Sequence, residues 1–121
     1  MKFSAIPFVL MVFALPARAA DNKDRGKQLF EQCTACHSLN AHNNDNGPSL
    51  EHLIGRHTAS VPDYTYSPAL KRANFEWTVN KLDAFLTSPQ NVVRGTKMPF
   101  AGMADARDRA DLIAYLEDIT R

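Results

Sequence analysis

Five consecutive residues, Cys33-Thr34-Ala35-Cys36-His37, carry the most specific chemistry in this sequence. Two cysteines separated by two residues and followed by a histidine are typical of covalent haem attachment. On a helical turn the two sulfur atoms lie close enough to bond to neighbouring vinyl groups of a single porphyrin. The histidine then turns its imidazole toward the iron as an axial ligand. The motif predicts one haem c, attached through Cys33 and Cys36 and ligated by His37.

Other sites also use two cysteines at this spacing, including disulfides, zinc sites and thioredoxin-like redox motifs. A zinc site would need two further ligands, but the sequence has only two cysteines, and His42, His52 and His57 stand singly. A thioredoxin-like motif would lie among alternating strands and helices, a pattern that the sequence lacks. A thiol–disulfide oxidoreductase is therefore the weaker alternative, and it would show two titratable thiols and no haem.

The N-terminus is typical of an exported protein. A short positive start is followed by the mostly apolar run 3–15, and then by small residues at Ala17 and Ala19, the positions that a signal peptidase reads. The run is shorter than the roughly 20 apolar residues that span a bilayer. We expect a signal peptide at residues 1–19, cleaved after Ala19, and one periplasmic domain at residues 20–121. A retained membrane anchor is the alternative.

Cleavage changes the charge balance of the chain. Removal of 19 of the 121 residues leaves 102, and the loss of Lys2 and Arg18 changes the formal net charge from +1 to −1. Without a basic excess, we expect no nucleic-acid partner and no stable membrane insertion. A domain of this size buries a marginal core, and both cysteines belong to the motif. A buried apolar cofactor would enlarge that core, and we expect a monomer.

Apolar residues recur with helical periodicity between polar, turn-forming loops. The sequence predicts helices at residues 24–33, 68–71, 77–86 and 105–119, and a long loop at 38–48. Ser67 is expected to cap the second helix with Pro68 as its first residue, and Ser88-Pro89 to end the third. No segment shows sustained strand alternation, so the predicted fold class is all-α.

The second axial ligand decides whether such a haem carries electrons or catalyses a reaction. After cleavage only Met98 and Met103 remain as thioether candidates. Met98 lies between two expected helices, where neighbouring glycine and proline restrict the backbone, and we expect it to bind the iron. Met103 is expected to pack in the core. Thioether ligation raises the reduction potential and closes the iron to small ligands, which argues against a peroxidase or a gas-binding sensor.

Further motifs follow in a characteristic order: Gly26, Phe30, the attachment motif, Gly47-Pro48-Ser49-Leu50, Gly55-Arg56, Tyr64-Thr65-Tyr66-Ser67, Trp77, Gly95-Thr96-Lys97-Met98 and Leu112-Ile113-Ala114-Tyr115-Leu116. Together they resemble the class I c-type cytochromes, of the soluble bacterial and mitochondrial kind, across essentially the whole mature chain. This resemblance implies a small cytochrome c fold. Its first and last helices would cross at Gly26, and its loops would wrap around one haem.

The resemblance also implies roles for individual residues. Met98 matches the distal ligand, and the carbonyl of Pro48 would orient His37. Four residues would hydrogen-bond around the haem propionates, namely Arg56, Tyr66, Trp77 and Thr96. Two positions depart from the mitochondrial pattern, because Leu70 replaces an asparagine and Phe85 a tyrosine on the distal side.

The implied function is a periplasmic one-electron carrier that is not an enzyme. Its partners would be a membrane cytochrome complex, a terminal oxidase or a periplasmic dehydrogenase. A dedicated electron-transfer subunit of one such dehydrogenase is the alternative. Lys27, Arg94 and Lys97 would lie near the haem edge, with acidic residues gathered on the last helix. That separation predicts a dipole that steers the edge toward an acidic partner.

Overall fold

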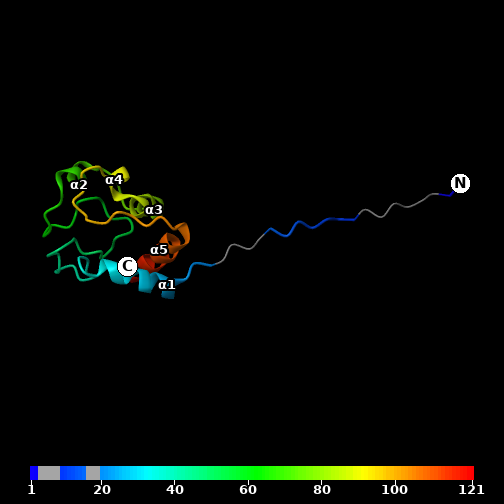
Figure 1. Cartoon of the computed structure of the whole chain (residues 1–121), viewed down its shortest axis with the longest axis horizontal. Coiled ribbons are helices and arrows are strands. Elements are labelled where there is room, and N and C mark those ends of the chain that lie inside the picture. Colours follow the sequence, from blue (N-terminus) through cyan, green and yellow to red (C-terminus); the bar gives the residue numbers. More distant parts are fainter. Residues whose placement is uncertain (3–8, 16–19) are drawn as a thin grey trace.

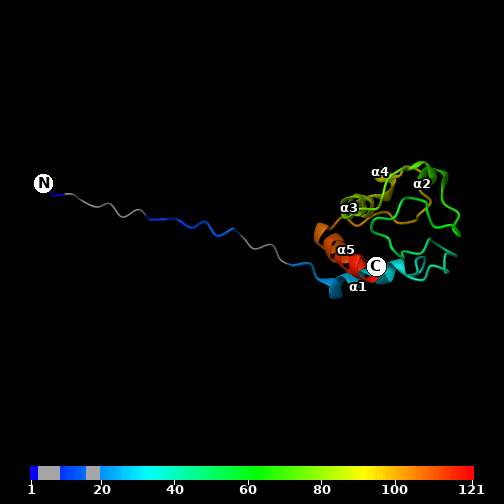
Figure 2. The same cartoon turned by 180° about the vertical axis from the view of Figure 1, so that it is seen from behind.

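The computed structural model describes residues 1–2, 9–15 and 20–121. Residues 9–15 are exposed and form no helix, and Figures 1 and 2 show this segment leading away from the folded body. The expected signal peptide falls largely on residues 3–8 and 16–19, and both these segments lie outside the described residues, as does the expected cleavage site. Within the described ranges, no helix is long and apolar enough to cross a membrane.

The described part of the chain is built from short helices joined by long loops (Figure 1). In chain order the elements are α1 (Lys23–Phe30), the 3-10 turn η1 (Glu31–Cys33), α2 (Pro68–Arg72), α3 (Val79–Thr87), α4 (Pro89–Val92) and α5 (Ala106–Ile119). Among the described residues the extended backbone pairs only at one isolated bridge, between His57 and Glu76. The predicted all-α class is confirmed.

Helices α1 and α5 pack closely against each other, as expected from the sequence. Gly26 is buried at their crossing, and a Cβ atom added there would lie 2.1 Å from the backbone oxygen of Asp111 and 2.7 Å from Cβ of Tyr115. The rings of Phe30 and Tyr115 pack beside this point with their centroids 5.6 Å apart. Only glycine lets the two backbones approach this closely, so one residue fixes how α1 meets α5.

Helix caps explain where the structure agrees with the expected boundaries and where it differs. The hydroxyl of Ser67 accepts a hydrogen bond from the Leu70 amide, and Pro68 opens α2 as predicted. The third helix begins at Val79 rather than at Trp77, because the hydroxyl of Thr78 accepts from the Lys81 amide and caps it there.

Two further differences concern helix ends. The expected first helix tightens into the 3-10 turn η1 after Phe30, so its last turn, which carries Cys33, is not α-helical. Pro89 ends α3 as expected, but it also opens the unpredicted helix α4. Proline lacks an amide hydrogen, yet the first residue of a helix needs none, so one proline can serve both purposes.

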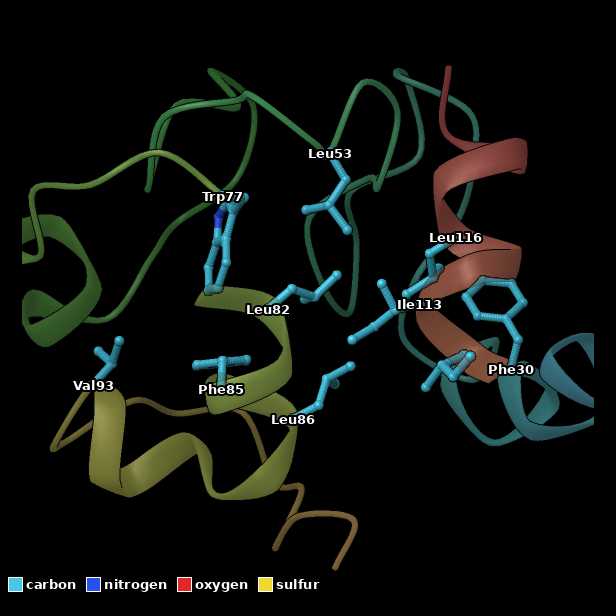
Figure 3. Close-up of a cluster of buried hydrophobic side chains, with 10 residues drawn as sticks. Phe30, Leu53, Trp77, Leu82, Phe85, Leu86, Val93, Ile113 and Leu116 are labelled. Atoms are coloured by element: carbon cyan, nitrogen blue, oxygen red, sulfur yellow. The ribbon is translucent and has the colours of Figure 1, made fainter. Parts of the chain in front are cut away.

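The buried side chains of α3 and α5 meet across the middle of the molecule. Figure 3 shows Leu82 and Leu86 of α3 directed toward Ile113 and Leu116 of α5, with Leu53 approaching from a loop. Trp77 packs edge-on against Phe85 with a centroid separation of 5.0 Å (Figure 3). The core is therefore formed by side chains of α3, of α5 and of the long central loops.

Candidate functional site

One cavity of about 360 Å³ is bounded by the core and by the loops around it. Its wall includes every site residue predicted from the sequence: Cys33, Cys36, His37, Pro48, Arg56, Tyr66, Trp77, Thr96 and Met98. Apolar residues of the core form much of the remaining wall, among them Phe30, Leu53, Leu82, Leu86 and Leu112. Residues separated by more than sixty positions in the sequence thus meet around a single space.

The two cysteines and His37 lie on one tight turn that continues η1. The amides of Cys36 and His37 both donate to the carbonyl oxygen of Cys33, at 3.2 and 2.9 Å. Cys33 is half-buried and Cys36 is exposed, and neither belongs to a disulfide. Burial, aided by nearby Cys36, raises the pKa of the Cys33 thiol, so this group is protonated at neutral pH. The turn holds both sulfur atoms and the imidazole at the cavity wall.

The loop that follows His37 contacts its imidazole through a hydrogen bond. Its Nδ1 atom donates to the carbonyl oxygen of Pro48 at 2.8 Å. Burial lowers the pKa of His37 despite this hydrogen bond, so the ring is neutral at pH 7. With Nδ1 carrying the proton, Nε2 keeps the lone pair that a metal requires.

Gly47 allows the loop to approach this histidine. A Cβ atom at Gly47 would lie 2.9 Å from the Cys36 carbonyl oxygen and 3.1 Å from the His37 ring. The first contact is shorter than real Cβ atoms show and the second is unusually tight, so a larger residue would push the loop, and Pro48 with it, away from the imidazole.

The two candidate methionines differ in position. Met98 lines the cavity, whereas Met103, also in the described part of the chain, packs against the core and does not form its wall. The segment that carries Met98 is fixed at its far end, where Gly102 adopts φ 121° and a Cβ atom would lie 2.2 Å from the Thr87 carbonyl oxygen. The Met103 amide donates to the Leu86 carbonyl oxygen at 2.7 Å. Of the two candidates, Met98 is therefore the one that lies in the cavity wall.

Arg56 and Tyr66 both form hydrogen bonds within the protein. Arg56 is half-buried and donates through one nitrogen to the carbonyl oxygens of Ser49 and Glu51, at 2.7 and 2.8 Å. The buried Tyr66 accepts from the Val61 amide at 3.2 Å, and burial raises the pKa of its phenol. Tyr66 therefore keeps its proton at neutral pH and can donate it. That Arg56 and Tyr66 hydrogen-bond to the haem propionates stays a prediction.

Thr96 and Trp77 form hydrogen bonds to other residues of the cavity wall. The hydroxyl of Thr96 accepts from the Met98 amide at 3.4 Å, which links this side chain to the candidate ligand. The backbone of Trp77 exchanges hydrogen bonds with the Gly55–Arg56 turn, donating to Arg56 at 2.9 Å and accepting from Gly55 at 2.7 Å. The two expected departures, Leu70 and Phe85, both line the cavity and make this part of its wall apolar.

Lys97 and the acidic residues of α5 are engaged within the protein. The ammonium of Lys97 donates to the Thr65 carbonyl oxygen and lies 4.7 Å from the centroid of the Tyr64 ring. On α5, Asp118 pairs with Lys23 at 2.6 Å. Asp108 and Asp111 pair with arginines at 3.6 and 3.3 Å. These ion pairs neutralise part of the acidic end, so the charge separation is smaller than the sequence suggests.

Sequence reasoning missed two residues that shape this site. Asn44 lies in the loop predicted at residues 38–48, yet its side chain is buried and only 7% exposed. Arg109 donates through one nitrogen to the carbonyl oxygens of Met103 and Ala104, both at 2.9 Å, and through another to Asp83 at 2.9 Å. Both residues bond mainly to backbone amide or carbonyl groups, which leave no pattern in a sequence.

The cavity suits a flat, largely apolar group with two charged substituents. Its volume falls in the range of about 300 to 1,000 Å³ that is usual for cofactor sites. Its wall is mostly apolar, with a guanidinium and a phenol near it that could meet anionic substituents. Two thiols and a neutral imidazole on one turn match the donors that haem c requires. The residues present therefore fit the predicted cofactor.

Comparisons with known proteins agree with this fit. The family model for cytochrome c matches residues 23–120. The chain is 39% identical over 111 residues to cytochrome c2 of Blastochloris viridis, covering 91% of this chain and 87% of that protein. It is 42% identical over 107 residues to the c-type cytochrome cy of Rhodobacter capsulatus, covering 88% of this chain and about half, 53%, of that protein.

A solved structure of cytochrome cH from Methylobacterium extorquens superposes with a TM-score of 0.73 at 35% identity, covering 79% of this chain and 97% of that chain. The structural match confirms the cytochrome c fold, and the sequence matches confirm the resemblance. The chain therefore belongs to the cytochrome c family, whose members are electron carriers rather than enzymes and hold one haem c covalently through a C-x-x-C-H motif.

Proposed function

We propose that this protein is a periplasmic shuttle that carries one electron at a time between redox complexes. Its haem would be attached to Cys33 and Cys36 and ligated by His37 and Met98. When bound, the haem supplies a one-electron Fe(III)/Fe(II) couple. Everything else that the shuttle needs is supplied by the chain's own residues.

Each group of residues has a distinct task in this proposal. The Pro48 carbonyl fixes the proton on Nδ1 of His37 and leaves Nε2 available as a ligand. Met98 supplies a thioether, which favours the reduced state and closes the site to small molecules. Arg56, Tyr66, Trp77 and Thr96 would donate hydrogen bonds to the propionates. The apolar side chains exclude water, so little solvent has to reorganise when the charge changes.

One observation carries the proposal: all nine predicted site residues line the same cavity, whereas Met103 does not. A carrier of this kind requires two strong axial ligands and a closed site, and the proposal assigns these places to His37 and Met98, which both line the cavity. The export step rests on the N-terminal sequence pattern, with its positive start, apolar run and small residues before Ala20.

A pair of matched methionine variants tests the ligand assignment. Met98→Ala should lose the weak absorption near the red end of the ferric spectrum that reports sulfur on iron. It should also lower the reduction potential and bind cyanide or carbon monoxide. Met103→Ala is the control and should keep the band, losing only about 2–5 kcal/mol of unfolding free energy from lost packing. If Met103→Ala lost the band and Met98→Ala kept it, the assignment would be wrong.

Localisation and partners need a separate experiment. Expression of the full chain in a Gram-negative host should give haem-stained protein in the periplasmic fraction, with Ala20 as its N-terminal residue. Crosslinking of this mature protein in native membranes and periplasm should then capture a redox complex. Recovery only in the membrane fraction, with residues 1–19 still attached, would favour the membrane-anchored alternative.

A further inference from the structure

We propose that Asn44 is a positioning residue that sets the strength of the hydrogen bond between His37 and Pro48, and through it the reduction potential of the haem. The proposal rests on the proposed function in one respect, because it takes His37 as an iron ligand. It assigns a role to a residue that touches neither the cofactor cavity nor the imidazole.

The side chain of Asn44 is buried and fully engaged. Its Oδ1 atom accepts from the Ser49 amide at 2.6 Å, in a hydrogen bond that is itself buried. Its Nδ2 atom donates to the Ala41 carbonyl oxygen at 2.7 Å. With 7% exposure, Asn44 is buried, unlike Asn43 beside it, which is exposed. Removing a buried amide that bonds two backbone groups is costly, because the Ser49 amide and the Ala41 carbonyl would each be left without a hydrogen bond.

The Ser49 amide and the Pro48 carbonyl belong to one peptide group. A trans peptide is planar, so its N–H and C=O bonds point in opposite directions within one rigid plane. Oδ1 of Asn44 accepts a hydrogen bond from the N–H of this peptide group, and Nδ1 of His37 donates one to its oxygen at 2.8 Å. A rotation of the plane would break both contacts together. Asn44 therefore fixes the direction in which the Pro48 oxygen faces the imidazole.

The other hydrogen bonds of this loop segment involve the adjacent peptide group, so we assign the orientation of the Pro48–Ser49 group to Asn44. The Ser49 carbonyl oxygen accepts from Arg56 at 2.7 Å, and the Leu50 amide donates to the Ser38 carbonyl oxygen at 2.8 Å. Both bonds lie on the next peptide group along the chain. On the other side, Gly47 makes the close approach possible but offers no side chain to hold it.

The contact also has an electronic effect. A peptide group that donates through its N–H becomes a stronger acceptor at its oxygen, because chained hydrogen bonds polarise one another. A stronger acceptor at Nδ1 makes the imidazole a more basic ligand, which stabilises Fe(III) over Fe(II). Asn44 therefore lowers the reduction potential, and its removal should raise it.

Two variants separate these effects in the haem-loaded protein. Asn44→Ala removes both hydrogen bonds of the side chain, whereas Asn44→Asp keeps an oxygen that accepts from the Ser49 amide. Asn43→Ala is the control for the same loop. Thr120→Val is the control for the loss of a buried hydrogen bond elsewhere, since the Thr120 hydroxyl donates to the Leu116 carbonyl oxygen at 2.8 Å.

The readouts are the reduction potential and the solvent exchange of the His37 Nδ1 proton, measured by NMR in the reduced protein. Asn44→Ala should raise the potential and speed this exchange by about tenfold, because losing a buried hydrogen bond makes local opening of the loop easier. Asn44→Asp should show near-wild-type exchange and a potential no higher than wild type. Both controls should match the wild type in both readouts.

Three results would overturn the proposal: unchanged proton exchange in Asn44→Ala, equal shifts in Thr120→Val, or a potential shift that appears only together with loss of the sulfur-to-iron band. The last result would locate the change on the distal side of the haem. Failure of the proposed function would look different, because the wild-type protein itself would then lack that band or a reversible one-electron wave.

Discussion

Replacing Gly26 by alanine would test whether the close crossing of α1 and α5 holds the fold together. An alanine Cβ atom would lie 2.1 Å from the Asp111 carbonyl oxygen, and moving it beyond 3.0 Å requires the helices to separate by about 1 Å. The obstructing atoms belong to the backbone and to a Cβ atom, so no side-chain rotation relieves the clash.

The size of the effect follows from two opposing contributions. Overpacking costs about 1–3 kcal/mol, and the upper end applies because backbone atoms are involved. Alanine favours a helix over glycine by about 1 kcal/mol. The net loss of unfolding free energy should be about 2 kcal/mol, which lowers the melting temperature of a domain this small by about 8–16 °C.

The assay is equilibrium unfolding of the haem-loaded protein in guanidinium chloride, followed by the fluorescence of Trp77, the single tryptophan. Gln28→Ala, an exposed substitution on the same helix, is the control and should change the unfolding free energy by less than about 0.5 kcal/mol. A Gly26→Ala protein as stable as the control, or more stable than wild type, would refute the reasoning.

Three further outcomes are expected. Acid acetone should leave the haem on the polypeptide, Cys33→Ala should keep one bond at lower yield, and His37→Ala should block maturation; release of the pigment from the wild type would contradict covalent attachment. The rate of electron transfer to an acidic redox protein should fall as salt rises, and Lys97→Glu should flatten that dependence, whereas a salt-independent wild-type rate would point to apolar docking. The hydrogen bond from Lys23 holds the pKa of Asp118 below its ordinary value of 3.8, so this carboxylate stabilises the fold above that pH and the contribution is lost as the pH falls below it. Acid unfolding curves of Asp118→Asn should therefore be shallower over that acid range, and curves identical to wild type would argue against the coupling.

The sequence predicted those parts of the structure that depend on residue type and spacing. The fold class, the cap at Ser67 and the crossing at Gly26 follow from local chemistry or from the family pattern, and the structure confirms the all-α fold. The attachment motif is read directly from five residues, because covalent chemistry requires specific side chains at fixed intervals.

Features that depend on backbone partners could not be predicted. Whether the helix begins at Trp77 or at Val79 depends on which side chain accepts from a free amide, here the Thr78 hydroxyl, and both starts fit the apolar periodicity. The ion pairs of Asp108 and Asp118 join α5 to residues near the N-terminus, about ninety positions away, so the charge pattern alone exaggerated the dipole. Asn44 acts on an amide five residues away, and in sequence it is indistinguishable from its exposed neighbours.

The side chains of the core and the wall of the cavity are largely the same residues, so we expect folding to depend on attachment of the cofactor. A chain without its cofactor would keep Leu53, Leu82 and Leu112 around an unfilled space of about 360 Å³. At about 24 cal/mol per Å³, that space would cost up to about 9 kcal/mol, which is comparable to the entire stability of a typical domain. The newly made polypeptide should therefore remain largely unfolded, and it should fold only after the haem is attached.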